Sequence, residues 1–292
     1  MKFPPYILLI LATILWGGNF VIGRAVTGEI PPFTLAFLRW CLAFLVFFPL
    51  AFKHAKRDWP KFKGHWKIVL VLALTGVAAF NTLVYIGVYS TTSINASLMN
   101  STTPIFIYIL SFIFLKERLS RNQMIGTAIS LLGVTFILSG GSLESLQQFT
   151  FNKGDLIVIV AVFCWSIYSL LVKQYADRLP GFSTFLVSIA IGALMLLPFA
   201  IYEHITLDSP IIWSVKTIGA VFYVGILASI VAFLSWNYGV IQIGANRASI
   251  YLNFIPFFSA IFATVFIGEQ LKLAQVIGGL AVIGGVILTN RN

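Results

Sequence analysis

The sequence predicts an all-α integral membrane protein with ten transmembrane helices, arranged as two inverted five-helix repeats. Three observations predict this fold. Of the 292 residues, 59% are hydrophobic and only 10% are charged, which leaves too few charges to cover a soluble domain of this length. Apolar segments of about 20 residues, the length that spans a bilayer, follow one another along the chain. The two halves of the chain also share a residue pattern.

The apolar segments define the predicted helices. They cover residues 5–24, 33–52, 67–88, 93–115, 122–140, 155–173, 182–201, 216–238, 245–267 and 272–290. The connections are short, the longest being 53–66 and 202–215, so no soluble domain is expected. The first apolar run is too long for a cleaved signal peptide, and nine more spans follow it, so we expect it to be retained.

The lysines and arginines predict the orientation of the chain in the membrane. With the N-terminus in the cytoplasm and alternating spans, fourteen of these residues face the cytoplasm and four face outward, while Arg39 lies within a span. Positive residues collect on the cytoplasmic side of membrane proteins, so we expect both termini there. This distribution accounts for the net charge of +10 without a nucleic-acid partner. The two cysteines, Cys41 and Cys164, lie in apolar runs and are interpreted as packing residues, and no metal or other cofactor is expected.

The second half of the sequence repeats features of the first. Trp16, Pro31 and Pro49 have counterparts 149 positions later, and Gly87 and Pro104 have counterparts 152 positions later. The predicted repeats are residues 1–148 and 149–292. Because each holds five spans, an odd number, the second repeat enters the membrane upside down. Inverted repeats of this kind are typical of transporters, in which two related packings exchange roles.

Several motifs resemble those of the EamA-type members of the drug/metabolite transporter superfamily. They are Trp16-Gly17-Gly18-Asn19-Phe20, Phe37-Leu38-Arg39-Trp40, the run Pro104…Glu117-Arg118-Leu119…Gly126…Gly133 and its echo Pro256…Glu269-Gln270-Leu271…Gly278…Gly285. The resemblance covers nearly the whole chain. It implies a ten-helix transporter of the bacterial inner membrane, often an exporter of amino acids or other small metabolites. The second copy of the first motif lacks its glycines, since Trp165 is followed by Ser166 and Ile167.

Polar and aromatic residues within six of the predicted spans form the candidate substrate site. Single Ser, Thr and Asn residues in membrane helices usually bond neighbouring helices, but this set falls in both repeats, which favours a pocket. The predicted substrate-binding residues are Trp16, Asn19, Phe20, Asn81, Tyr85, Asn100, Ser101, Trp165, Tyr168, Trp236, Asn237 and Asn253. Ser97 and Tyr108 share a predicted helix face with Asn100 and Ser101.

Pro104 and Pro256 are the predicted hinges. Each is expected near the middle of a span, where proline removes a hydrogen bond and kinks the helix. The carbonyl groups of Asn100 and Leu252 then need another donor, which either a neighbouring side chain or a cavity would supply. The glycines of spans 122–140 and 272–290 are interpreted as packing or homodimer surfaces, because small residues allow close approach of two backbones.

Charged groups are expected to be rare at membrane depth. All nine acidic residues and all three histidines are expected in loops or at helix ends, which argues against a proton relay, a cationic substrate and a membrane-embedded hydrolase. Arg39 is the exception. We expect it to reach the surface or to pair with an outer acidic residue, and attraction of a substrate carboxylate is the alternative.

The sequence therefore predicts a secondary transporter, not an enzyme, that moves a small organic metabolite by alternating access. An aromatic and amide-lined pocket suits an amino acid or a similar amphipathic solute. The alternatives are a broad-specificity exporter of toxic compounds and a non-transporting membrane scaffold or receptor.

Overall fold

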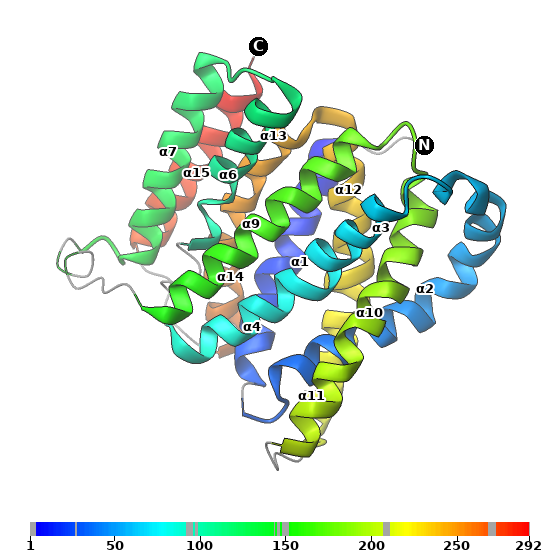
Figure 1. Ribbon diagram of the computed structural model, residues 1–292. Coiled ribbons are helices and arrows are strands. Elements are labelled where there is room, and N and C mark those ends of the chain that lie inside the picture. The colour runs from blue at the N-terminus through cyan, green and yellow to red at the C-terminus, as the bar shows by residue number, and fades with distance from the viewer. Residues whose placement is uncertain are drawn as a thin grey trace.

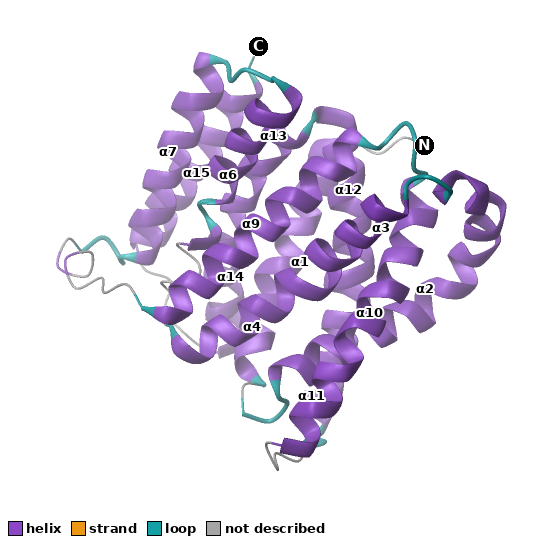
Figure 2. Cartoon of the chain, viewed as in Figure 1, coloured by secondary structure: helices purple, strands orange, loops and turns teal. Residues whose placement is uncertain are grey.

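The structure is a computed structural model that describes residues 4–26, 28–91, 96, 99–142, 144, 147, 152–206, 211–267 and 273–291. The described part of the chain is helical and contains no strand (Figure 2). The all-α prediction is therefore confirmed for these residues. Ser97 and Glu269, which the sequence analysis singled out, lie outside them.

The helices follow the predicted spans closely in most of the chain. They are α1 (Pro5–Ala25), α2 (Pro32–Phe62), α3 (Trp66–Leu72), η1 (Ala73–Ala79), α4 (Phe80–Ser90), α6 (Thr103–Leu110), η2 (Ser111–Leu115), α7 (Arg121–Leu138), α9 (Lys153–Gln174), α10 (Gly181–Thr206), α11 (Val215–Phe222), η3 (Tyr223–Val231), α12 (Ala232–Ile243), α13 (Ala245–Ser249), η4 (Ile250–Asn253), α14 (Phe254–Ile267) and α15 (Leu273–Asn290).

One predicted connection is largely helical and a second is helical in its first part. Helix α2 continues to Phe62, through most of the predicted connection 53–66, and α10 continues to Thr206. The extension of α2 is amphipathic, because Ala55, Asp58 and Phe62 are buried at intervals of three or four residues while the lysines between them are exposed. Hydropathy alone did not predict this extension, because the charged residues on its exposed face lower the mean hydropathy of the segment.

Eight helical segments of the described chain are long and apolar enough to cross a bilayer. They are residues 5–23, 32–62, 66–88, 153–174, 181–206, 215–243, 245–265 and 273–290. Thr103–Leu115 is apolar but shorter, and α7 begins with the polar residues Arg121, Asn122 and Gln123, which lower its mean hydropathy.

Several of these segments depart from α-helical geometry in mid-course. The segment 66–90 contains the π-helical turn η1, and the segment 215–243 contains the π-helical turn η3. The segment 245–267 passes through the 3-10 turn η4 before α14 begins. Such irregular turns redirect backbone carbonyl groups away from the regular pattern and are often found at functional sites.

The helices form a central group flanked by two helix pairs (Figure 1). Helix α1 packs against α12 and α14, and α4 packs along α9. On the left of Figure 1, α7 and α15 lie side by side, and on the right α2 lies along α10. The centre of the bundle is therefore built from α1, α4, α9, α12 and α14.

Four glycines hold α7 and α15 in direct backbone contact. A Cβ atom on Gly126 would lie 2.5 Å from the carbonyl oxygen of Gly285, and one on Gly133 would lie 2.7 Å from that of Gly278. The reverse contacts, from Gly285 to Gly126 and from Gly278 to Gly133, are equally close. The packing interpretation of these glycines thus fits the structure, and the face they form is filled within the chain.

Two buried carboxylates fix the ends of α2 and α10 to each other. At the start of α2, the backbone N–H and the hydroxyl of Thr34 donate to the carboxylate of Glu203 on α10, at 2.7 and 2.8 Å. At the other end of the pair, Ser183 near the start of α10 donates to Asp58 on α2 at 2.7 Å. The prediction that these acidic residues lie in loops or at helix ends is corrected in part, because Asp58 lies inside a helix and the side chains of Asp58 and Glu203 are both buried. Negative groups at helix N-termini stabilise the helix dipole.

Substituting Gly285 by alanine tests the packing of α7 on α15. The new methyl group meets the Gly126 carbonyl, so we expect the free energy of unfolding to fall by about 1–3 kcal/mol. Gly284→Ala is the matched control, because its Cβ meets no atom within 4 Å and alanine favours the helix. Thermal unfolding of both variants in detergent checks this. Equal melting temperatures for the two would contradict the proposed contact.

Candidate functional site

A cluster of five aromatic side chains fills the centre of the bundle. We call Trp16, Trp165, Tyr168, Phe233 and Trp236 the central aromatic cluster. The rings of Trp16 and Trp165 meet edge to face with centroids 5.2 Å apart, and Phe233 lies 5.2 Å from Trp165. All five are buried. The two tryptophans that the repeat relates, one from each half of the chain, are therefore in direct contact.

The indole N–H groups of this cluster differ in their hydrogen bonding. Trp16 Nε1 donates to the carbonyl oxygen of Ala228 at 3.0 Å, and Trp236 Nε1 donates to the hydroxyl of Ser169 at 3.2 Å. The Nε1 atom of Trp165 is buried and has no hydrogen-bond partner in the structure.

A cavity lies beside the cluster, between α1, α4, α9 and the turn that leads into α14. We call it the central cavity. It is lined by Trp16, Asn19, Phe20, Phe80, Asn81, Val84, Asn100, Trp165, Leu252 and Ile255. Six of the twelve predicted substrate-binding residues thus lie around one space. The apolar members Phe80, Val84, Leu252 and Ile255 were not predicted.

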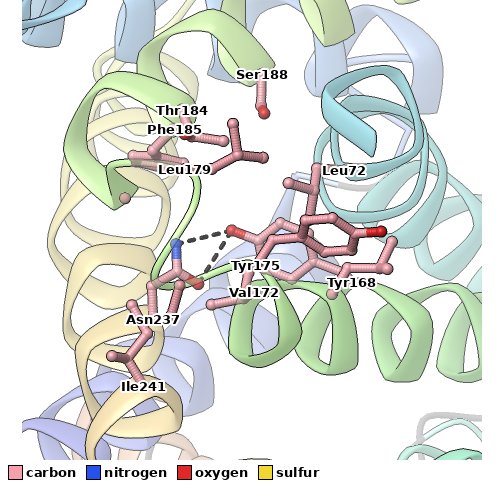
Figure 3. Close-up of a pocket in the computed structure, with 13 residues that line it drawn as sticks. Leu72, Tyr168, Val172, Tyr175, Leu179, Thr184, Phe185, Ser188, Asn237 and Ile241 are labelled. Atoms are coloured by element: carbon pink, nitrogen blue, oxygen red, sulfur yellow. Dashed lines mark hydrogen bonds between the residues drawn. The ribbon is translucent and has the colours of Figure 1, made fainter. Parts of the chain in front are cut away.

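A second cavity lies between α3, α9, α10 and α12 (Figure 3). We call it the α9–α10 cavity. Two further predicted residues line it, and they bond each other: the hydroxyl of Tyr168 donates to Asn237 Oδ1 at 3.0 Å, and Asn237 Nδ2 lies 2.8 Å from the same hydroxyl. The wall opposite this pair is formed by Leu179, Thr184 and Ser188 (Figure 3).

The central cavity and the α9–α10 cavity lie one after the other along α9. On α9, Trp165 lines the central cavity, whereas Tyr168 and the residues toward the α9–α10 turn line the other. The rings of Trp165 and Tyr168 stack with centroids 5.2 Å apart. Leu72, near the start of its span, lines the α9–α10 cavity, and Phe80 further along lines the central one. The aromatic cluster therefore stands between the two cavities.

Arg39 lies deep in the protein and does not reach the surface. Its exposed fraction is 0%. Its Nη1 donates to Asn81 Oδ1 at 2.8 Å and to the Tyr85 hydroxyl at 3.1 Å, its Nη2 donates to the carbonyl oxygen of Ala228 at 3.1 Å, and its Nε donates to the Ser229 hydroxyl. The guanidinium also lies over the ring of Trp40, 5.1 Å from its centroid.

The expectation that Arg39 snorkels to the surface or pairs with an outer acidic residue is therefore wrong. Its hydrogen-bond partners in the described chain are neutral groups, and the ion pairs of that part of the chain involve other residues. Desolvating a guanidinium is costly, and the cost is offset only when its N–H groups find acceptors. The polar residues of α1 and α4, together with Ala228 and Ser229 of η3, supply these acceptors, which explains why these polar groups lie at this depth.

The remaining predicted residues occupy structural positions. Tyr85 bonds Arg39 and lies 3.4 Å from Asn19 Oδ1. Asn253 Nδ2 donates to Ser130 on α7 at 2.9 Å, so it joins η4 to α7 and lines neither cavity. Ser101 is buried in the turn before α6, and Trp236 contacts Trp16 and Trp165 without lining either cavity.

The predicted mid-helix position of Pro104 is corrected to a helix start, whereas Pro256 lies in mid-course of the helical segment 245–267, just after the 3-10 turn η4, and the hinge role of both prolines stays a prediction. Pro104 lies in the first turn of α6, which begins at Thr103, and Pro256 is the third residue of α14. Proline is well tolerated in a first turn, because the N–H it lacks would have no partner in the helix. The Asn100 carbonyl accepts a hydrogen bond from the Thr103 hydroxyl, so a neighbouring side chain supplies the missing donor.

Arg39 is the residue of this site whose surroundings sequence reasoning predicted incorrectly. One signal pointed to it: it is the charged residue within the apolar run 33–52, and ionisable groups at membrane depth are functional candidates. Within the described chain, no group of three or more His, Cys, Asp or Glu residues is arranged to hold a metal ion.

Comparison with known proteins identifies the family. The model of the EamA-like transporter family matches residues 3–139 and 152–291. The chain belongs to this family. An uncharacterized transporter of Archaeoglobus fulgidus is 30% identical over 290 residues, which cover 99% of this chain and 98% of that protein. The uncharacterized transporter YyaM of Bacillus subtilis is 27% identical over 97% of this chain and 92% of its own length.

Two further similarities are informative. A probable terminal-alkyne amino-acid exporter of Streptantibioticus cattleyicolor is 26% identical over 227 residues, covering 77% of this chain and 73% of that protein. A solved crystal structure superposes with a TM-score of 0.76 at 19% identity and covers 99% of this chain and 97% of the other. The last similarity concerns the fold. Together, the family and the eight apolar helices make this a multi-pass membrane protein of a transporter family.

Replacing Arg39 by lysine tests its role as a hydrogen-bonding centre. A lysine ammonium lacks the planar fork that reaches Ser229, Asn81 and Ala228 together, so acceptors in the core are left unpaired. We expect the free energy of unfolding to fall by about 1.5–3 kcal/mol, as for loss of a charged hydrogen bond. Thermal unfolding in detergent measures this.

The matched control for Arg39→Lys is Arg57→Lys. The Arg57 side chain is 71% exposed and lies 3.4 Å from the buried Asp58 carboxylate, and lysine keeps the positive charge, so this replacement should leave the melting temperature unchanged. An unchanged melting temperature for the Arg39 variant would refute the structural role of the guanidinium.

Proposed function

We propose that this protein is a secondary transporter that moves a small organic metabolite, an amino acid or a similar amphipathic solute, across the cytoplasmic membrane by alternating access. Export is the proposed direction. The observation that carries the proposal is the succession of two cavities separated by the stacked rings of Trp165 and Tyr168. A solute held on one side of this stack needs only a rearrangement of the aromatic cluster to reach the other side.

The proposal includes ten membrane-spanning segments in two inverted repeats, residues 1–148 and 149–292. The family model matches the chain twice, once in each half. The glycine contacts between α7 and α15 support an in-plane two-fold axis. In the repeat, Gly126 corresponds to Gly278, and Gly133 corresponds to Gly285. Gly126 contacts Gly285, the counterpart of Gly133, and Gly133 contacts Gly278, the counterpart of Gly126. An axis that exchanges the two halves produces this crossed pattern.

The α2–α10 pair supports the same axis. Thr34 and Ser183, which are 149 positions apart, occupy the third position of α2 and α10, and each bonds a carboxylate near the far end of the other helix. The π-helical turns η1 and η3 interrupt the third segment of each half. Two similar packings related in this way can exchange, which is the basis of alternating access.

The chemistry of the central cavity favours an amphipathic solute. Its polar side chains are the amides of Asn19, Asn81 and Asn100, and its remaining wall is aromatic or aliphatic. Small-molecule sites commonly combine an apolar wall with a few placed polar groups. The relative from Streptantibioticus cattleyicolor is named a probable exporter of an amino acid, and this supports an amino acid as the class of solute.

Membrane flux is the direct test of this function. The purified protein in liposomes loaded with a mixture of amino acids and related metabolites should release at least one of them faster than protein-free liposomes. Release of hydrophobic toxic compounds instead would favour the broad-specificity exporter. Absence of flux for every solute would contradict transport and favour a scaffold or receptor.

Cysteine labelling tests the proposed orientation, in which both termini face the cytoplasm. The native cysteines Cys41 and Cys164, both free thiols, are first replaced by alanine. In intact cells a membrane-impermeant maleimide should then label Glu144→Cys but not Lys61→Cys, because the basic end of α2 faces inward. Labelling at position 61 alone would reverse the orientation.

A further inference from the structure

Two residues that line the central cavity carry buried hydrogen-bond donors that have no partner. They are Nδ2 of Asn81, a residue 5% exposed, and Nε1 of Trp165, a residue 1% exposed. Buried donors are nearly always bonded, so two among the residues that line one cavity need an explanation. An acceptor group of a bound molecule would provide it.

Arg39 determines which end of the Asn81 amide is available. A guanidinium donates hydrogen bonds and accepts none, so the group that faces it at 2.8 Å must be the carbonyl oxygen of the amide. The NH2 group of Asn81 is then turned away from Arg39. The amide cannot rotate to offer its oxygen to the cavity without giving up the bond to the guanidinium.

The second donor belongs to α9. Phe80, the neighbour of Asn81 on α4, packs on the Trp165 ring with centroids 4.8 Å apart. Helices α4 and α9 pack along each other, so the two lining residues come from adjacent helices. Trp165 is also the cluster tryptophan whose N–H is not used to join helices, in contrast to Trp16 and Trp236.

The electrostatic field at this wall is positive. Arg39 bonds two residues that line the cavity, Asn81 at 2.8 Å and Asn19 at 3.5 Å, and its partners in the described chain carry no negative charge. A positive charge at low dielectric attracts an anion strongly. The donors and the field therefore favour the same kind of group, an acceptor with a negative charge.

We propose that the central cavity binds the carboxylate of its solute through Asn81 Nδ2 and Trp165 Nε1, with Arg39 as the positioning residue that orients the Asn81 amide and supplies the positive field. This inference rests on the proposed function and narrows its substrate class. The solute carries a carboxylate at one end and an apolar group at the other, which packs on Phe20, Val84 and Ile255. Short apolar amino acids and the corresponding carboxylic acids have this form.

Matched acid and amide probes test the proposal by binding. The purified protein in detergent is titrated, with thermal shift as the readout, with L-leucine and L-leucinamide, L-phenylalanine and L-phenylalaninamide, and 4-methylpentanoate and 4-methylpentanamide. We expect the acid of at least one pair to bind about tenfold or more tightly than its amide, the effect of a hydrogen bond to a charged group. Equal affinities within each pair, or no binding by any acid, would overturn the proposal.

A pair of tryptophan variants separates the donor from the ring. Trp165→Phe removes the N–H and keeps an aromatic ring, and it should weaken binding of the preferred acid about tenfold and of its amide less, because a hydrogen bond to a neutral carbonyl oxygen is weaker. Trp59→Phe is the control, because Trp59 is 50% exposed, packs on Phe62 and Trp66 and lines neither cavity. Identical acid affinities for the two variants would contradict the role of Trp165.

The orientation of the Asn81 amide is tested in the same assay. Asn81→Asp keeps the shape of the side chain and replaces the donor by an anionic oxygen beside Arg39, so the preference for acids over amides should disappear. A retained preference would count against the proposal. The flux assay is separate: acid-selective binding without flux would refute transport and keep this site, whereas flux without acid selectivity would refute the site and keep transport.

Discussion

The guanidinium of Arg39 is the interaction on which the centre of this protein depends. Its donors reach α1 through Asn19, α4 through Asn81 and Tyr85, and η3 through Ala228 and Ser229. Where water is absent, a polar group that is not bonded within the protein costs several kcal/mol. The helices that carry these acceptors are therefore held at hydrogen-bonding distance from α2.

Irregular backbone provides carbonyl oxygens that can accept hydrogen bonds from side chains, which a regular α-helix does not. In an α-helix each carbonyl is used by the N–H four residues later, but the Ala228 carbonyl in the π-helical turn η3 accepts from both Trp16 and Arg39. The turns before α6 and α14 place Asn100 and Leu252 at the central cavity. Departures from helical geometry thus coincide with the site, as expected for backbone that lines a cavity in a membrane protein.

The sequence predicted most of the helices, because hydropathy reports directly whether a segment is compatible with lipid. It also paired Trp16 with Trp165 through the repeat, and the two rings touch. It failed for Arg39, since the acceptors of that residue come from three elements distant in sequence. It failed for the helix start at Pro104, because a proline in an apolar run is consistent with either a kink or a first turn. The choice depends on the turn before it, where the Thr103 hydroxyl bonds the Asn100 carbonyl.

The apolar lining of the central cavity was beyond prediction for a different reason. Val84, Leu252 and Ile255 line it, yet in the sequence they are indistinguishable from residues that face lipid. Burial by protein and burial by lipid select the same side chains. Only the positions of the neighbouring helices distinguish the two.

The stacked rings of Trp165 and Tyr168 have an electrical consequence. A membrane potential falls mainly across the driest part of a protein, and here the aromatic cluster is the layer between two cavities. A monoanion that passes this layer moves through part of the voltage, and a full crossing of the membrane is worth about 2.3 kcal/mol per 100 mV. With the cell interior negative, this work is released on the way out, so the resting voltage itself would drive carboxylic acids outward, while net-neutral zwitterions would pass without gain or loss.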